Sequence, residues 1–558
     1  MSQGYDHRVT SSPSFALGLD FGTGSVRALI VDCHDGSEAG VGACDFPQGE
    51  GGVLVSDDPN LARQDPRDWF LGASKAIYAA IASSGVNPTA IVGIGLDATA
   101  STPVPVDAGC RPLCFDAKFS DDLAAFAWLW KDHTSHAEAA EITALAMAEG
   151  RPYLAKFGGA YSSEWFWSKA LHCARTSPVV FDASATWLEE TDLIAAHLCG
   201  IDVPASVKRS ACAAGHKAMF NPQWGGYPDR EFLSGLDPRL ARLHDSMTGG
   251  VFACDVAAGG VSGACAAETG IPKDTPVAVG IIDAHAGAVG SGIVAGTMVK
   301  ILGTSSCDIL VGPSDGSVPD IEGVAGVAHD SVIPGMLGIE AGQAAVGDLF
   351  DWYARSCGMR HDDLTEAAAQ ITPGSSGLLA LDWNNGNRNV LADPLLTGLL
   401  VGQTLRTTPA QIYRALIEST AFGGLKIIQQ IEEVGVPVEQ MIVCGGIADK
   451  NPLVLQIYAD VLGRPIKVSR SQETCALGAA IFGAVVGGAH SNTDLAIKAM
   501  TGSPREIYRP VEAAQETYRE LYALYIDLHD AFGRPKSAGS LHHVMKRLIE
   551  IRQRSRPA

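Results

Sequence analysis

The chain of 558 residues is 46% hydrophobic and 18% charged, and its formal net charge is −21 with a pI near 5.1. It is too long for one domain, so we expect two large ones. The acidic balance argues against nucleic acid and against an anionic membrane surface as partners.

Neither a membrane span nor an oxidising compartment is indicated. No apolar run approaches the roughly 18 residues that a span needs, and the first fourteen residues are polar, without the apolar core of a secretory leader. The thirteen cysteines are scattered, and only Cys110 and Cys114 lie close in sequence. We expect a cytoplasmic protein with reduced cysteines, mostly small core residues, and a solvated basic helix over 546–556.

The first informative segment is 16–31, which reads ALGLDFGTGSVRALIV. Apolar runs on both sides of a Gly-Thr-Gly-Ser turn predict a β-hairpin. The tip around Gly22 and Thr23 offers backbone N–H groups and a hydroxyl to a phosphate, and Asp20 offers a carboxylate to a metal beside it. An ordinary hairpin is the alternative reading.

Further along, strand-like runs alternate with helical patterns, which indicates an α/β protein. The runs at 91–96 and 277–282 are expected to be strands, and 150–230 is a polar, aromatic-rich insertion. Trp165 and Trp167 within it are expected to be core residues rather than a surface that packs against a sugar. The small residues at 290–296 suit a hinge between two halves. The expected domains are 14–292 and 297–490, with a helical extension at 491–558.

A second hairpin is predicted at 299–311, VKILGTSSCDILV, where Gly303 and Thr304 repeat Gly22 and Thr23. It has Ile301 where the first has Asp20, so only one half supplies the metal-side carboxylate. After it come a helix at 409–433, a strand at 441–444, the turn of Gly445 and Gly446, and helices at 451–462 and 510–532. The last helix carries a core-facing stripe: Tyr518, Leu521, Tyr525 and Leu528.

Asp283 lies where the run VAVGII ends and a small-residue helix begins. A carboxylate there can point into a cleft and accept a proton, although a pure helix-capping role is the local alternative. His285, two residues on, is a weaker candidate for the same base. The sequence contains no P-loop and no dinucleotide fingerprint, so any ATP must be held by hairpin tips and strand-end turns.

Four ordered motifs over about 14–490 resemble the FGGY family of carbohydrate kinases: the two hairpins, GGIADKNPLVLQIYADVLGRPI at 445–466 and TCALGAAIFGAVVGG at 474–488. The resemblance implies an α/β fold of the actin and hexokinase type, in which a ribonuclease H-like motif is duplicated and two lobes close over a cleft.

The same resemblance assigns roles to residues of this chain. It implies ATP and Mg²⁺, with Asp283 as the catalytic base and Asp20 at the metal. Gly22, Thr23, Gly303 and Thr304 would hold phosphate oxygens, and Gly445, Gly446 and Asn451 would line the adenosine pocket.

The segment 95–107 resembles the substrate loop of the family, where the small Ala98 leaves room for an acceptor longer than glycerol. The acceptor is suggested by the segments 161–172, 208–220 and 20–32, which resemble the pentulose branch of the family. This branch implies phosphorylation of L-ribulose at its 5-hydroxyl, a step of L-arabinose breakdown, with the sugar held by four residues: Ala98, Lys217, Asp283 and Glu340. Lys208 is a rival for the role of Lys217. Because Gly24 replaces the Asp that many kinases of this branch have, D-ribulose, ribitol or another polyol stay open as acceptors.

Two other classes of protein are weighed against the kinase. One is a nucleotide-switched binding protein of the actin or heat-shock-chaperone type, and the other is an inactive, sugar-binding regulator. The sequence leaves the oligomeric state open, with a homodimer as one option.

Overall fold

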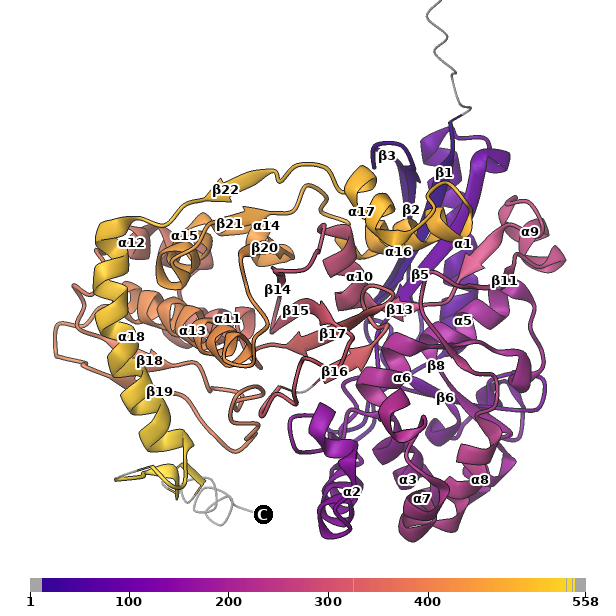
Figure 1. Cartoon of the computed structure of the whole chain (residues 1–558), viewed down its shortest axis with the longest axis horizontal. Coiled ribbons are helices and arrows are strands. Elements are labelled where there is room, and N and C mark those ends of the chain that lie inside the picture. The colour runs from indigo at the N-terminus through magenta and orange to yellow at the C-terminus, as the bar shows by residue number, and fades with distance from the viewer. Residues whose placement is uncertain (1–12, 325, 538, 544, 547–558) are drawn as a thin grey trace, which may run out of the picture.

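The computed structural model describes residues 13–324, 326–537, 539–543 and 545–546, and Figure 1 shows two lobes side by side. One lobe is built from the first half of the chain and the other from the second. The polar residues 1–12 and, apart from Lys546, the predicted basic helix at 546–556 lie outside the described residues.

The sheet of the first lobe has seven strands in the order β11-β12-β5-β1-β2-β3, with β13 also paired to β5. β1, β2 and β3 form an antiparallel meander, and β5 runs parallel to β1. The predicted hairpin is therefore confirmed. The strands are β1 (Phe15–Phe21), β2 (Ser25–Asp32), β3 (Glu38–Asp45), β5 (Ile91–Ala98), β11 (Ala257–Gly260), β12 (Pro276–Ala278) and β13 (Ile281–Ile282).

The sheet of the second lobe repeats this plan in the order β16-β17-β15-β14-β20-β21-β22. β14, β15 and β17 form the antiparallel meander, and β20 runs parallel to β14 as β5 does to β1. This correspondence confirms the predicted duplication. The strands are β14 (Thr297–Leu302), β15 (Ser306–Pro313), β16 (Gly326–His329), β17 (Met336–Ala341), β20 (Gln440–Cys444), β21 (Ile466–Val468) and β22 (Glu506–Tyr508).

Short strand pairs and helices complete both lobes. The pairs are β4 (Arg63–Gln64) with β7 (Ala127–Trp128), β6 (Pro103–Val106) with β8 (Thr186–Glu189), β9 (Arg209–Ser210) with β10 (Val251–Phe252), and β18 (Leu379–Leu381) with β19 (Leu399–Val401). The helices of the first lobe are α1 (Pro66–Ser84), α2 (His136–Ala148), α3 (Phe166–Thr176), α4 (Pro178–Ala183), α5 (Glu190–Cys199), α6 (Ala211–Lys217), α7 (Arg230–Leu236), α8 (Pro238–Ser246), α9 (Gly263–Thr269) and α10 (Asp283–Gly290). Those that follow are α11 (Gly347–Cys357), α12 (His361–Ala369), α13 (Pro409–Glu432), α14 (Gly446–Lys450), α15 (Pro452–Leu462), α16 (Thr474–Val486), α17 (Thr493–Met500) and α18 (Glu512–Gly533).

Local chemistry explains where the long helices begin. The Asp65 side chain accepts from the N–H of Arg67 at the start of α1, and Thr408 and Gln411 form a capping box at the start of α13. The predicted helix at 409–433 is thus confirmed to within one residue. The predicted strand at 277–282 is instead two short strands, β12 and β13, interrupted at Val279 and Gly280.

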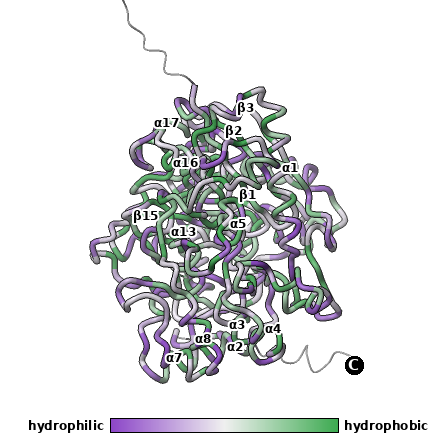
Figure 2. The backbone as a smooth tube through the Cα atoms, turned by 90° about the vertical axis from the view of Figure 1, so that its right-hand side faces the viewer, coloured by the Kyte–Doolittle hydropathy of each residue, from purple (hydrophilic) through white to green (hydrophobic). Residues whose placement is uncertain are grey.

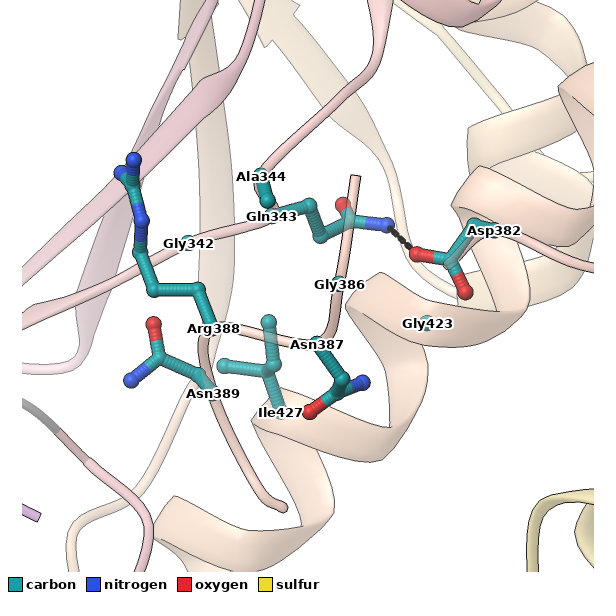
Figure 3. A pocket seen from close by; sticks show the side chains of 10 residues that line it. All are labelled: Gly342, Gln343, Ala344, Asp382, Gly386, Asn387, Arg388, Asn389, Gly423 and Ile427. Carbon is teal, nitrogen blue, oxygen red and sulfur yellow. Dashed lines mark hydrogen bonds between the residues drawn. The ribbon is translucent and has the colours of Figure 1, made fainter. Parts of the chain in front are cut away.

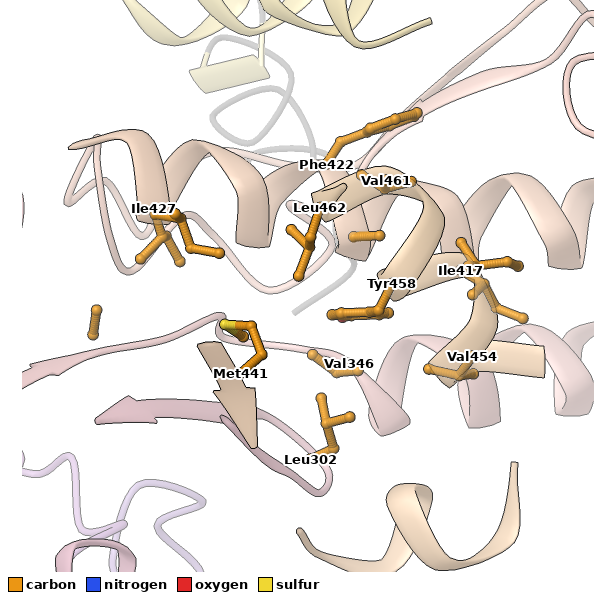
Figure 4. Close-up of a cluster of buried hydrophobic side chains, with 14 of the residues drawn as sticks. Leu302, Val346, Ile417, Phe422, Ile427, Met441, Val454, Tyr458, Val461 and Leu462 are labelled. Atoms are coloured by element: carbon orange, nitrogen blue, oxygen red, sulfur yellow. The ribbon is translucent and has the colours of Figure 1, made fainter. Parts of the chain in front are cut away.

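The core of the second lobe lies between the sheet and helices α13 and α15, where Leu302 and Met441 from the strands meet Ile417 and Tyr458 from the helices (Figure 4). In the described residues, many hydrophobic segments run through the interior, while segments of both kinds reach the periphery (Figure 2). Burial of such apolar surface is the main stabilising term.

The aromatic predictions are confirmed. Trp165 and Trp167 are buried in a core cluster of the insertion. In the stripe of α18, Tyr518 and Tyr525 are 1% exposed, while Leu521 and Leu528 pack against the same cluster at partial burial.

Helix α16 belongs to the second half of the sequence but packs on the first sheet, and Figure 1 shows this yellow helix beside the indigo strands β1 and β2. Backbone contact requires glycine here. A Cβ on Gly18 or Gly95 would lie 1.8 Å from a carbonyl oxygen of α16, and one on Gly478 would lie 1.9 Å from the carbonyl of Ala286 in α10. The two halves therefore interlock through α10 and α16.

The segment 491–508 contains a strand as well as a helix, since β22 pairs with β21 at the edge of the second sheet. No helix of the described residues is long and apolar enough to cross a membrane.

Candidate active site

Three aspartates meet where strands of the first sheet end. Asp20 in β1 is the register partner of Asp97 in β5. Asp97 also pairs with Ile281 of β13, a strand that ends at Ile282, directly before Asp283. Asp283 is the first residue of α10, and its Oδ1 accepts from the N–H of Ala284 at 2.6 Å. The N-cap position belongs to Ile282, so Asp283 is not the capping residue of that helix.

Burial and mutual repulsion raise the pKa values of these acids. The pKa of Asp283 rises to about 6, first because of burial and second because of Asp20. The pKa of Asp97, which is fully buried, lies well above its usual range for the same two reasons. Burial also raises the pKa of Asp20, which a hydrogen bond from Asp97 opposes. Among the described residues no donor reaches either oxygen of Asp97, so no hydrogen bond offsets the rise in the pKa of this carboxyl.

Each hairpin ends in a tight tip. The N–H of Gly22 bonds the carbonyl of Ser25, and the N–H of Gly303 bonds that of Ser305, both at 3.0 Å. In the first tip the hydroxyl of Thr23 accepts from the indole of Trp130 at 3.0 Å, which leaves its own proton free to donate. In the second tip Thr304 is exposed. The backbone carbonyls of Gly303 and Thr304 accept hydrogen bonds from N–H groups at the start of α11. The N–H groups of Gly22 and Gly303 thus have partners within the tips, whereas the hydroxyl of Thr23 can donate to a phosphate oxygen.

The glycine turn after β20 lies against the second hairpin. Gly445 has φ +93°, and a Cβ there would lie 2.7 Å from the carbonyl oxygen of Leu302. Gly446 is exposed, and its own Cβ would meet nothing within 4 Å. Asn451 accepts from the N–H of Val454 as the cap of α15 and lies 3.3 Å from the hydroxyl of Thr365. Its side chain thus already has structural partners.

Lys217 and Glu340 come from different lobes and form an ion pair. Lys217 ends α6, Glu340 lies in β17, and the ammonium is 3.2 and 3.1 Å from the two carboxylate oxygens. Burial lowers the pKa of Lys217, but Glu340 outweighs it and the pKa lies above its usual value. Burial opposes ionisation of Glu340 too, yet Lys217 and then His285 hold its pKa well below the usual range. Lys208 instead donates to the carbonyl of Ala257 at 2.5 Å.

Ala98 and two histidines complete this region. Ala98 is fully buried beside Ile282, next to Asp283. His216, His285 and Glu340 offer three ligand atoms within 4.8 Å of one another, a set that can hold a transition metal. The Lys217 ammonium lies against the same carboxylate and repels a cation, so we assign no metal to it.

The second lobe also contains a small polar pocket, lined in part by Gln343, Asp382 and Arg388 (Figure 3). The amide of Gln343 donates to Asp382 at 2.7 Å and accepts from Lys300 at 3.0 Å. None of the predicted site residues lines this pocket. Burial lowers the pKa of Arg388, but Glu164, then Cys307 and Glu340, raise it overall.

Sequence reasoning missed two buried acids, Asp97 and Glu190. Glu190 accepts from the hydroxyl of Thr99 at 2.7 Å, and burial raises its pKa well above the usual range. A signal for Asp97 was present, because it follows an apolar strand and precedes small residues in the same manner as Asp283. Glu190 has no comparable signal in the sequence, because only the packing of α5 against β5 brings it close to the aspartates.

Two related lobes with a Gly-Thr tip at each sheet, and a buried acid at the strand ends of the first sheet, are the features of the two-lobed fold of the actin and hexokinase type. The N-terminal domain of the FGGY family of carbohydrate kinases matches residues 15–290, and its C-terminal domain matches 298–486. The chain belongs to this family.

Two curated relatives are ribulokinases. That of Geobacillus thermodenitrificans is 39% identical over 98% of both chains, and that of Anoxybacillus flavithermus is 38% identical over 97% of this chain and 98% of the relative. A xylulose kinase from Rhodospirillum rubrum superposes with a TM-score of 0.77 over 93% of this chain and 99% of that one, at 23% identity. This last likeness concerns the fold alone.

Proposed function

We propose that this sugar kinase is a ribulokinase, which transfers the γ-phosphate of ATP to the 5-hydroxyl of L-ribulose as a step of L-arabinose breakdown. The observation that carries the proposal is the full-length similarity to ribulokinases together with the Lys217–Glu340 pair beside Asp283. A pentulose has a carbonyl and several hydroxyls, which an ammonium donor and a carboxylate acceptor can bind.

Asp283 is proposed as the general base. With a pKa near 6 it is mostly ionised at neutral pH and still basic enough to accept the proton of the attacking hydroxyl. Its backbone bond to Ala284 fixes one oxygen, so the other is the one that faces the acceptor. Lys217 and Glu340 orient the sugar, and Ala98 leaves room for it.

Thr23 and Thr304, with Gly22 and Gly303, are proposed to hold the phosphates, and Gly445, Gly446 and Asn451 to border the adenosine. The exposed Gly446 allows close approach of a ligand. The side chain of Asn451 caps α15, so its proposed role is to hold the start of that helix beside the adenosine. Removing donors of this kind weakens the hold on charge that develops during phosphoryl transfer.

Asp20 is proposed to hold Mg²⁺, directly or through water. Asp20 and Asp97 are adjacent carboxyl groups, and no donor among the described residues reaches the oxygens of Asp97, which suits a hard cation. When bound, Mg²⁺ neutralises charge on the phosphates.

The deciding experiment is ADP release with Mg-ATP and a panel of L-ribulose, D-ribulose, ribitol, L-xylulose and glycerol. We expect kcat/KM for L-ribulose to be at least about tenfold higher than for the others, about 1.4 kcal/mol of discrimination. Preference for another sugar would support the kinase activity but assign a different acceptor. ADP release that no sugar stimulates would contradict the proposal and favour a nucleotide-switched protein.

We also propose a cytoplasmic location, because all thirteen cysteines, each within the described residues, are free thiols. The division into 14–292, 297–490 and 491–558 and the homodimer stay predictions. Limited proteolysis and sedimentation velocity would test them.

A further inference from the structure

Three nitrogen atoms surround one oxygen of Glu340. Lys217 Nζ lies 3.1 Å from Oε2, His285 Nε2 lies 3.4 Å from it, and His216 Nδ1 lies 3.5 Å from it. Both imidazoles are fully buried, and their ring centroids are 4.5 Å apart. The histidines come from α6 and α10 of the first lobe, whereas Glu340 belongs to the second. The carboxylate is therefore held across the junction of the lobes.

The partner on the far side of His285 determines which nitrogen faces Glu340 as a donor. His285 Nδ1 lies 2.7 Å from the sulfur of Cys212. Burial raises the pKa of this thiol, so it keeps its proton and can donate it to Nδ1. If Nδ1 accepts from the thiol, the hydrogen of the imidazole is on Nε2, which lies 3.4 Å from Oε2 of Glu340.

We propose that His285, with His216 beside it, is a positioning residue that fixes the Glu340 carboxylate as an acceptor for one hydroxyl of the sugar, and so strengthens binding of the sugar without touching it. This inference rests on the proposed function of Glu340. Neither Nε2 of His285 nor either nitrogen of His216 meets strict hydrogen-bonding geometry with a partner among the described residues. Burying an imidazole unpaired is costly, above all for His216. Its long contact with Glu340 is thus its main polar contact.

The geometry explains why Lys217 alone is not sufficient. Its ammonium contacts both oxygens of Glu340 at nearly equal distances, so it supplies charge but little preference for one rotation of the carboxylate. The histidines approach only Oε2. The Glu340 side chain is about one-fifth exposed, so the carboxylate can be reached by a ligand.

Two polar substitutions of His285 separate this role from simple packing. In His285→Gln the carboxamide nitrogen can reach the place of Nε2 and donate to Glu340, whereas in His285→Asn it reaches only the place of Nδ1, beside Cys212. We expect KM for the sugar to rise at least tenfold in His285→Asn and to stay within about threefold of the parent in His285→Gln, with KM for ATP unchanged in both. His244→Leu in α8 is the matched control outside the site.

A double-mutant cycle tests whether His285 acts through Glu340. In a Glu340→Gln background, His285→Asn should add no further loss, because the group that it positions is already altered. Equal sugar KM values for His285→Gln and His285→Asn, or fully additive losses in the cycle, would overturn the inference. Because the parent enzyme is assayed beside the variants, absence of sugar-stimulated ADP release in the parent would instead mark failure of the proposed function.

Discussion

At the scale of single residues, the chemistry depends on how burial changes ordinary side chains. Asp283 is an unremarkable aspartate in the sequence, yet burial beside Asp20 raises its pKa to about 6. Its position at a strand end was predictable from the run VAVGII. The surrounding acids were not, because they come from strands and helices distant in sequence.

Replacing the proposed base tests the residue directly. Asp283→Asn preserves size and removes the proton acceptor, so we expect kcat to fall by about 10²- to 10⁴-fold. The affinity for ADP, measured by calorimetry, should stay within about twofold. Asp245→Asn, at an exposed aspartate of α8, is the control and should keep the parental kcat. Turnover that survives in Asp283→Asn would exclude Asp283 as the base.

The raised pKa of Asp283 also predicts a pH profile. The base works only when deprotonated, so acidification through a pKa of about 6 removes it. We expect kcat/KM for the sugar to fall about tenfold per pH unit below pH 6 and to level off above it. A profile that is flat down to pH 5, recorded with the protein still folded by circular dichroism, would show that Asp283 does not limit the reaction.

At the scale of elements, the two hairpins and the helix α16 carry the architecture. The hairpins are local and were predicted from apolar runs around Gly-Thr turns. The placement of α16 was not, because it depends on glycines in β1, β5 and α10 that allow backbone contact between remote segments. Such close packing gives the helix almost no space to shift.

Gly478 provides a test of this interlock. A Cβ would lie 1.9 Å from the carbonyl oxygen of Ala286, so Gly478→Ala must push α16 and α10 apart. We expect a loss of about 1–3 kcal/mol in the free energy of unfolding, seen as a lower melting temperature. Gly263→Ala in α9, where a Cβ meets nothing within 4 Å, should leave the melting temperature unchanged or raise it slightly. Equal melting temperatures would contradict the packing.

At the scale of the whole molecule, the last segment of the chain is integrated into both lobes. Strand β22 extends the second sheet, α17 packs on α16, and Tyr518 and Tyr525 of α18 are buried in the core of the second lobe. The hydroxyl of Tyr518 donates to Glu418 at 2.8 Å. This region therefore contributes to the stability of the part that carries Glu340.

Truncation tests that integration. A chain that ends at residue 490 exposes the apolar surface which α18 covers, so we expect it to be insoluble or to melt well below the full chain. Soluble expression and thermal unfolding are the measurements. A soluble truncated chain with parental kcat and melting temperature would instead show that 491–558 is an independent extension.

The sequence by itself determined the duplicated hairpins, the α/β class, the helices predicted at 409–433 and 451–462 to within one residue, and the resemblance to one kinase family. These features depend on local spacing, where a turn between apolar runs or a cap before a helix is enough. Only the tertiary structure decided which remote residues meet. It brought Asp97 beside Asp20, Lys217 onto Glu340 across the lobes, and two histidines onto one carboxylate oxygen. Such contacts depend on how sheets and helices pack, and the pKa values that make the site reactive exist only after that packing has excluded water.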